Sequence, residues 1–419
     1  MKIKIKKVND FFSISILLLI IGFCALRKIT FFMYFAEMVF LFCCIDRIKK
    51  RGRMIIDNYM KLSIIFLLFA GLSYIWSIST ENTISALLPL FQISIIGILL
   101  DDYLDDLEKI NFVWKALIVS SIIMTVFLLF TTPYVDWINA MKASSNASTA
   151  ANRIGRSIGF QPNGLGIICA FTIIIWIYVY SIGKANKKLT FIMITLLTIV
   201  ILFTKSRKAL IILVLGPILY LILYKARKSK LLLILPVAGV AIVIMTWLFL
   251  NVSFLYDMIG FRLVGFFSVF NHSINADASI LARNNMVKTG LDLFKQYPVA
   301  GVGFGNFSYY YFHNYGGWAE VYAHNNYIEI LSDTGLIGFV LYYYIPFSIL
   351  FNLIKNWKRF VIIDRKLTAL LITFIIIRLI MDYGMVDYDD EFVQICTVTC
   401  YCGIKYLKRK VIFDAKKGE

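Results

Sequence analysis

The short segment Thr204-Lys205-Ser206-Arg207-Lys208 places a cluster of cations between two apolar stretches. The planar guanidinium of Arg207 suits phosphate oxygens, so we interpret the segment as a hairpin that could bind a phosphorylated substrate at the depth of lipid headgroups. The alternative is a simple turn whose long basic side chains only reach toward water.

His324 is one of 3 histidines in the chain and lies in Ala323-His324-Asn325-Asn326-Tyr327, at the end of the longest polar stretch. An unperturbed imidazole titrates at about pH 6.5, so His324 is a candidate proton acceptor. His272 and His313 lack a comparable context. The alternative for His324 is a structural histidine.

Three further arginines could help to hold a phosphate or diphosphate. Arg153 and Arg156 end a polar stretch just before an apolar one. Arg283 opens the segment 280–297, whose apolar residues recur near helical spacing until Pro298 ends the pattern. The alternatives are a basic pair without a ligand and, for Arg283, the polar face of a surface helix.

A glycine-rich segment and an aromatic segment precede His324. Gly301-Val302-Gly303-Phe304-Gly305-Asn306 lacks the spacing of a dinucleotide fingerprint and predicts tight turns or a close backbone approach to a ligand. The residues 307–322 are rich in Tyr, Phe and Trp. They could stack on sugar rings, or they could form an aromatic belt at the membrane interface.

Acidic residues gather near the C-terminus, where a hard cation with oxygen ligands is conceivable and a solvated loop is the alternative. They are Asp382, Asp387, Asp389, Asp390 and Glu391. The sequence contains no Cys/His set with zinc spacing and no Walker loop, and no motif in it indicates a cofactor. The 7 cysteines lie in or beside apolar blocks, and we expect them to be small buried residues without disulfides.

The composition excludes an ordinary soluble protein. Of 419 residues, 60% are hydrophobic and 16% are charged, whereas soluble domains average about 45–50% and about 25%. The net charge of +18 comes from clusters between apolar blocks, a pattern typical of cytoplasmic loops rather than of a nucleic-acid-binding surface. We therefore expect an all-α integral membrane protein that contacts membrane lipid and no nucleic acid.

The apolar blocks are long enough to cross about 30 Å of hydrocarbon as helices. We predict about twelve transmembrane helices in a single polytopic membrane domain over 1–419. The N-terminal block is interpreted as an uncleaved first helix. The predicted cores are 9–26, 29–45, 62–78, 85–100, 112–131, 163–182, 189–204, 208–224, 231–250, 334–354, 366–382 and 391–406.

The distribution of Lys and Arg predicts that both termini are cytoplasmic. This scheme places an acidic loop, 101–108, on the cytoplasmic side. It leaves two long segments outside: a smaller extracytoplasmic loop, 132–161, and a large extracytoplasmic loop, 251–323. We expect an amphipathic helix over 280–297 within the large loop, near the membrane surface.

Together these motifs resemble the superfamily of O-antigen ligases and Wzy-type polysaccharide polymerases of bacterial envelopes. Four segments carry the resemblance, which covers roughly 150 to 340. They are Pro298 to Phe307, Ala323 to Glu329 with Thr334 to Gly338, Thr204 to Arg207, and Arg156 to Asn163. Arg283 stands where the family has an arginine that opens the helix of the large loop.

The resemblance implies a GT-C-like fold and an inverting, metal-independent glycosyltransferase in the bacterial cytoplasmic membrane. Its substrate would be a glycan on undecaprenyl diphosphate, and a chain-length regulator and a flippase are the implied protein partners. His324 would be the general base, with Arg207 and Arg283 stabilising the leaving diphosphate. Substrate binding would involve Arg153, Arg156, Asn163, Ser206, Gly303 and Asn325.

The expected activity is polymerisation or transfer of lipid-linked repeat units of a surface polysaccharide, capsule or O-antigen. A ligase that transfers O-antigen to the lipid A core is the first alternative. A transporter that flips lipid-linked oligosaccharide is the second, but a transporter should show paired repeats and charges near the bilayer midplane. Lys115 and Arg378 are the main charges inside the predicted spans.

Overall fold

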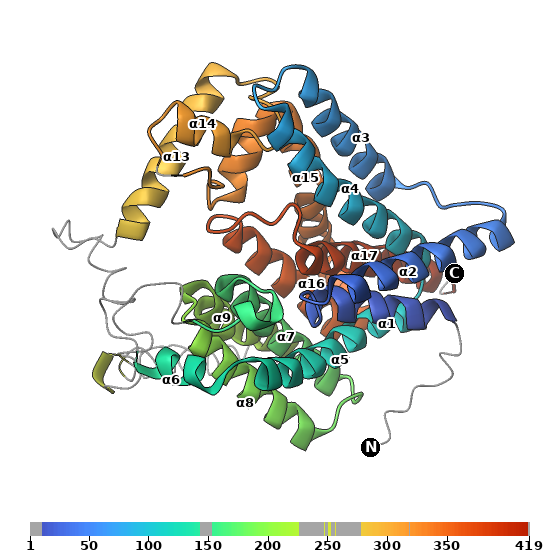
Figure 1. The fold of residues 1–419 in the computed structure, drawn as a ribbon. Helices are drawn as coiled ribbons and strands as arrows, with labels where there is room; N and C mark the ends of the chain where they lie inside the picture. Colours follow the sequence, from blue (N-terminus) through green and yellow to red (C-terminus); the bar gives the residue numbers. More distant parts are fainter. Residues whose placement is uncertain are drawn as a thin grey trace. The chain divides into compact units, whose positions relative to one another are not determined.

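Every regular element of the protein is helical in the computed structural model, which describes residues 11–142, 153–225, 247, 250–252, 256, 278–317 and 319–417 (Figure 1). Seven of the described helices are long and apolar enough to cross a membrane. They agree with seven of the predicted cores and confirm a multi-pass membrane protein. The spans are Asn58–Ile75, Thr80–Tyr103, Leu107–Thr131, Pro162–Ser181, Lys187–Thr204, Arg207–Lys225 and Asn326–Lys355.

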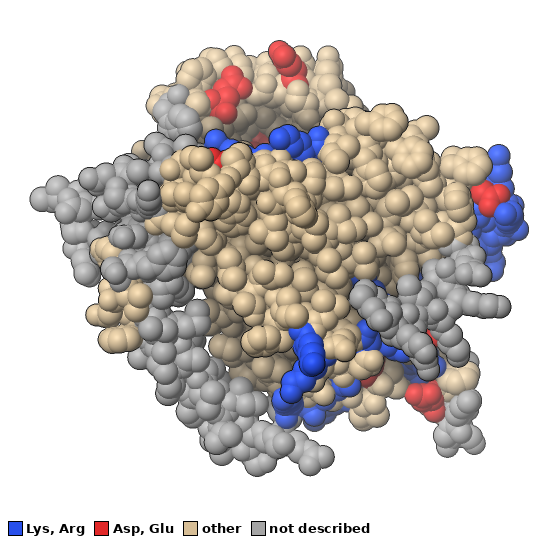
Figure 2. Space-filling view, turned by 60° about the horizontal axis from the view of Figure 1, so that its bottom comes forward, with Lys and Arg blue, Asp and Glu red and all other residues tan. Residues whose placement is uncertain are grey.

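The remaining predicted cores have different outcomes. The core 9–26 is a short apolar helix, α1 (Phe11–Cys24), of 14 residues. The cores 29–45, 366–382 and 391–406 are helical but fall outside the seven apolar spans; they belong to α2 (Thr30–Arg51), α16 (Trp357–Met381) and α17 (Glu391–Lys417). The core 231–250 lies almost entirely outside the described residues. Most of the described surface in Figure 2 is tan, with few charged side chains, as expected of a protein that faces lipid.

The chain forms two compact units. The first comprises Met1–Gly52, Glu108–Asn275 and Lys358–Phe374. Within it, the almost completely buried α7 (Pro162–Ser181) packs against both α8 (Lys187–Thr204) and α9 (Arg207–Lys225). Its other described elements are α1, α2, α5 (Leu107–Thr131), α6 (Tyr134–Lys142) and the short 3-10 helix Arg156–Ile158.

The second unit comprises Arg53–Leu107, Ala276–Trp357 and Ile375–Glu419. Its helices α3 (Asn58–Leu72) and α4 (Thr80–Tyr103) form a hairpin, and α3 packs on α15 (Asn326–Lys355). Near the start of α15 lie α13 (Ala278–Gln296) and α14 (Phe307–His313) (Figure 1). The helix predicted over 280–297 is thus confirmed as α13.

Hydrogen bonds and an ion pair connect helices of the second unit near two opposite ends of α3. At one end, the Phe304 N–H donates to Ser73 Oγ (2.8 Å) and the Asp387 N–H donates to Asn326 Oδ1 (3.2 Å). At the other end, the Lys405 ammonium pairs with Asp57.

The acidic loop predicted over 101–108 is wrong at its start. Helix α4 continues to Tyr103, so Asp101 and Asp102 are helical and buried. The Lys405 ammonium lies 2.9 Å from Asp101 Oδ1, and the Ile55 N–H donates to Asp102 Oδ1 (2.7 Å). These partners lie far away in the sequence, which is why the run of acidic residues was assigned to a loop.

Candidate active site

The cationic segment around Arg207 is a tight helical hairpin in the first unit. Helix α8 ends at Thr204, Lys205 caps it in the left-handed region with φ 50°, and α9 begins at Arg207. The Ala209 N–H donates to Ser206 Oγ (3.4 Å). The hairpin therefore fixes the backbone on both sides of Arg207, whose side chain is half-buried.

Arg153 joins this hairpin to the start of α7. Its Nε donates to the Thr204 carbonyl (2.7 Å), and its Nη2 donates to Asn163 Oδ1 (2.5 Å). The structure thus brings together three segments that the sequence singled out. Arg153 positions the other two, whereas Arg156 opens a 3-10 helix and is exposed.

His324 stands in a turn that is held from both sides. Its backbone has φ 53°, and Asn325 caps α15 by accepting the Ile328 N–H (3.2 Å). The Glu329 carboxylate reaches back to accept the Ala323 N–H (2.5 Å). A residue of this type with positive φ is uncommon and persists where the surrounding structure enforces it. The two hydrogen bonds provide that constraint and fix the position of the half-buried imidazole.

Tyr322 packs beside this imidazole, with ring centroids 4.2 Å apart. Burial of its hydroxyl and the nearby Glu329 carboxylate raise the pKa of Tyr322, so the phenol stays neutral. The charge of Arg283, on α13, acts in the opposite direction on Tyr322. Tyr322 therefore packs against His324 and also senses the charge of Arg283, 41 positions before His324 in the sequence.

The glycine-rich loop is hydrogen-bonded to the backbone of α15 at a point where that helix is interrupted. Gly335 has φ 60° and ψ −164°, which interrupts the helix. The Gly303 N–H donates to the Asp333 carbonyl (2.9 Å), and the Leu336 N–H donates to the Pro298 carbonyl (2.9 Å). A Cβ on Gly301 would lie 2.4 Å from the Asp333 backbone. The predicted close approach is thus real, and its partner is the chain's own backbone.

The carboxylate of Asp333 caps this loop. It accepts the Gly305 N–H (2.8 Å) and the Phe307 N–H (2.7 Å), and it is completely buried. We expect Asp333→Ala to lower the unfolding temperature of the purified protein, because each buried N–H left without an acceptor costs about 1–3 kcal/mol. Asp333→Asn keeps one acceptor oxygen, so its unfolding temperature should lie between those of wild type and Asp333→Ala. Equal unfolding temperatures for all three proteins would contradict this role.

The hairpin at Arg207, the glycine-rich loop and the turn at His324 all lie in a part of the chain that matches a known family. The model of the O-antigen ligase family matches residues 191–343. This part of the chain is therefore similar to the O-antigen ligase family. Among curated proteins, none matches the chain.

The segment that is similar to the O-antigen ligase family contains most of the predicted site residues. Arg207, Ser206, Arg283, Gly303, His324 and Asn325 lie within the matched residues, and Arg153, Arg156 and Asn163 precede them. Arg207 belongs to the first unit and His324 to the second. That these two side chains act on one substrate stays a prediction from the sequence.

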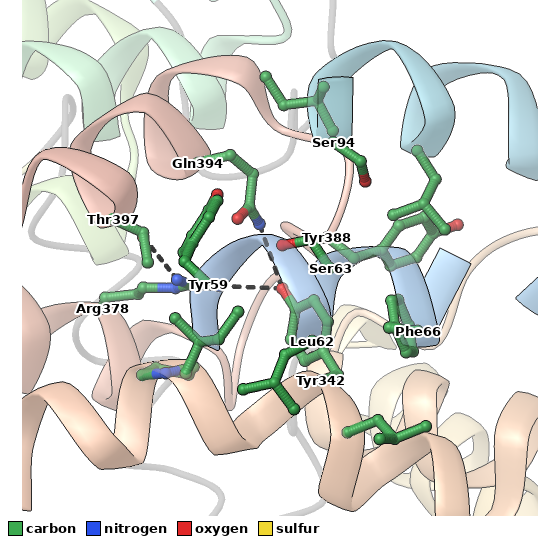
Figure 3. A pocket seen from close by; sticks show the side chains of 15 residues that line it. Tyr59, Leu62, Ser63, Phe66, Ser94, Tyr342, Arg378, Tyr388, Gln394 and Thr397 are labelled. Carbon is green, nitrogen blue, oxygen red and sulfur yellow. Dashed lines mark hydrogen bonds between the residues drawn. The ribbon is translucent and has the colours of Figure 1, made fainter. Parts of the chain in front are cut away.

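Sequence reasoning missed a pocket in the second unit that has one polar wall (Figure 3). Tyr342 lies within the segment matched by the family, and Arg378, Gln394 and Thr397 lie beyond it. The Arg378 guanidinium donates to the Tyr342 hydroxyl (2.9 Å) and to Thr397 Oγ1 (2.5 Å), and its Nε lies 3.3 Å from Asp387 Oδ2. Gln394 also donates to the Tyr342 hydroxyl (3.2 Å). The intramembrane charge that the sequence noted at Arg378 thus has an acidic partner.

This pairing corrects the interpretation of the C-terminal acidic residues as a solvated loop. Asp382 and Asp387 are buried, with 0% and 1% of their surface exposed. Asn326 ties both to α15, since its backbone N–H donates to the Asp382 carbonyl (2.7 Å) and its side chain accepts the Asp387 N–H. Among the described residues, no group of three or more His, Cys, Asp or Glu side chains could hold a metal ion.

Proposed function

We propose that the protein is a glycosyltransferase that polymerises or transfers glycan repeat units linked to undecaprenyl diphosphate. The observation that carries this proposal is the O-antigen ligase match, which spans the rigid turn at His324, the hairpin at Arg207 and the helix with Arg283. Members of this family are glycan ligases or polymerases. The source membrane is the bacterial cytoplasmic membrane, and the reaction takes place at its outer face.

In the proposed reaction, a hydroxyl of the acceptor sugar attacks the anomeric carbon of the donor. A new glycosidic bond forms, the bond from that carbon to the diphosphate oxygen breaks, and undecaprenyl diphosphate leaves. His324 takes the hydroxyl proton, a contribution of about 10²–10⁴-fold. A single displacement inverts the anomeric carbon.

The leaving diphosphate gathers negative charge as the bond breaks. Arg207 and Arg283 stabilise that charge, because guanidinium groups make paired hydrogen bonds to phosphate oxygens and act strongly in a partly dry site. Arg156 and Asn163 would contact the same diphosphate, with Ser206 and Asn325 holding the ends of the helices that present these groups. Gly303 allows the loop beneath His324 to pack closely.

The topology of the second unit supports the proposed orientation. The loop residues 297–326 and the turn after Asp382 belong to one group of helix ends, and Asp57, Asp101 and Lys405 belong to the other. We propose that the first group faces outward and that both termini are cytoplasmic, because the basic clusters near 47–61 and 405–417 follow the second group.

Deleting the protein from its host tests the function directly. We expect long-chain glycan to disappear and the single lipid-linked repeat unit to accumulate at the outer face. A ligase would instead leave full-length glycan attached to its polyprenyl carrier. A transporter would leave the repeat unit at the cytoplasmic face, protected from an external glycosidase in intact spheroplasts. The ligase result would restrict the protein to glycan transfer without polymerisation, and the transporter result would overturn the glycosyltransferase proposal.

A metal chelator should leave the reaction rate in purified membranes unchanged. The negative charge that a divalent cation would stabilise is assigned here to Arg207 and Arg283, and the Asp387 carboxylate is already paired with Arg378. Glycan synthesis before and after addition of EDTA measures this. Activity that is lost with EDTA and restored by Mg²⁺ or Mn²⁺ would contradict the assignment.

A further inference from the structure

The short helix α14 has one buried and one exposed face. Phe307 and Tyr311 point into a core with Met286 and Leu293, and their rings stack with centroids 5.9 Å apart. The opposite side of the helix and the residues after it stay accessible. We call this surface the α14 face; it consists of Tyr309, Phe312, His313, Tyr315 and Glu320.

The rings of the α14 face are held in a fixed arrangement. Tyr309 and His313, one helical turn apart, stack with centroids 4.1 Å apart and planes at 22°. Phe312 meets His313 edge-on, at 4.8 Å and 82°. Because the buried face anchors the helix, these rings form a preorganised surface for a flat apolar group.

Hydrogen-bonding groups border these rings. The Glu320 carboxylate lies 3.7 Å from His313 Nδ1, and both side chains are about 40% exposed (42% and 40%). Asn82 donates to the other Glu320 oxygen (3.2 Å), which orients the carboxylate. Gln296 donates to the Tyr315 hydroxyl (2.8 Å). The border therefore offers both acceptors and donors to a ligand that carries hydroxyl groups.

The charge of this region favours a sugar as the ligand over a lipid headgroup or an acidic ligand. The chain has 43 Lys and Arg among 419 residues, yet the 297–322 segment contains none, and Glu320 is its one carboxylate. Surfaces that bind anionic lipid or phosphate are rich in Lys and Arg. A carboxylate beside solvent-accessible aromatic rings favours an uncharged ligand with hydroxyl donors.

We propose that the α14 face binds uncharged sugar rings of the glycan substrate. A sugar ring has an apolar C–H face that packs on an aromatic ring and a rim of hydroxyls that the border groups can satisfy. Glu320 and His324 are four positions apart in the sequence, so their Cα atoms lie within about 14 Å of one another. A glycan on this face thus extends to the reacting end. The inference rests on the proposed function and adds the chemical class of the bound glycan.

Binding to the purified full-length protein in nanodiscs tests this site. The probes are oligosaccharides from partial acid hydrolysis of the host's surface polysaccharide, separated into neutral and acidic fractions. We expect the neutral fraction to bind wild type, and we expect Tyr309→Leu with Phe312→Leu to weaken binding by about tenfold and to shorten the glycan product in cells. Glu320→Gln, which preserves size, should weaken binding in the same direction.

The control is Phe351→Leu, which replaces a side chain that is 63% exposed near the far end of α15. It should bind the neutral fraction as wild type does. The His324→Asn protein should also bind it, since that substitution removes the proton acceptor and leaves the α14 face intact. Unfolding temperatures of all variants establish that they are folded. If the double variant is not folded, the binding measured for Glu320→Gln tests the inference instead.

Three results would overturn the inference: unchanged binding in both α14 variants, preferential binding of the acidic fraction, or capture of phosphatidylglycerol vesicles that the double variant loses. The last would make the α14 face a membrane contact. Each of these can occur while His324→Asn still stops glycan transfer, so they leave the proposed function standing. Full transfer by His324→Asn would instead overturn the proposed function.

Discussion

Replacing His324 with asparagine is expected to reduce glycan polymerisation by about 10²–10⁴-fold while the protein remains folded and inserted. Asparagine is chosen because position 324 has φ 53°, a conformation that Asn tolerates and Ala adopts at a cost. The capping hydrogen bond at Asn325 and the Glu329 bond to the Ala323 N–H do not involve the imidazole. The substitution therefore removes the proton acceptor and keeps the turn.

The measurement is incorporation of purified lipid-linked repeat units into polymer by detergent-solubilised protein. Tyr322→Phe is the matched control, because it keeps the ring that packs on His324 and removes a phenol that stays neutral in the wild type. We expect that control to keep most of the activity. A His324→Asn protein that polymerises at the wild-type rate would remove the imidazole from the reaction.

The parts of the fold that follow from local sequence were predictable. Seven span cores rest on continuous apolar runs, and α13 rests on helical spacing that ends at Pro298. The turns at Gly301, Gly303 and Gly305 all have positive φ, as a run of spaced glycines indicates. All 7 cysteines are buried and form no disulfide, as their apolar surroundings indicate.

The parts that depend on distant partners were not predictable. Asp333 was not singled out by the sequence, yet it caps a loop 28 positions before it. Arg378 was noted as a charge inside a predicted span, and the sequence did not indicate that Asp387 pairs with it. Asp101 was assigned to a cytoplasmic loop, because its partner, Lys405, lies 304 positions away. In each case the type of residue was readable from the sequence, but its partner was set by tertiary packing.

The same distinction applies to the candidate site. The sequence singled out Arg153 as a substrate ligand, whereas the structure uses its guanidinium to join the Thr204 carbonyl to Asn163. A guanidinium has five donors, so the residue type alone does not separate a structural arginine from one that binds phosphate. Arg207 differs because it opens α9 beside a left-handed cap, where the first turn of the helix also favours an anion.

Arg207→Ala is expected to reduce polymerisation by about 10²–10³-fold, the loss typical of removing one donor that stabilises charge in the transition state. Arg207→Lys keeps the charge and loses the planar fork, so its rate should lie between those of wild type and Arg207→Ala. The hairpin itself should survive, because the Ser206 hydroxyl and the Arg153 bond to Thr204 hold it without the Arg207 side chain.

Lys208→Ala is the control for the local charge, because Lys208 follows Arg207 directly in the same cationic segment and has a half-buried side chain as well. If Arg207 acts through paired hydrogen bonds to the diphosphate, Lys208→Ala keeps most of the activity. If the segment only attracts anionic lipid, the Arg207→Ala and Lys208→Ala variants lose similar, small amounts, and Arg207→Lys behaves as wild type. Initial rates at saturating lipid-linked substrate separate these outcomes, since a transition-state contact lowers kcat whereas lipid attraction alone does not.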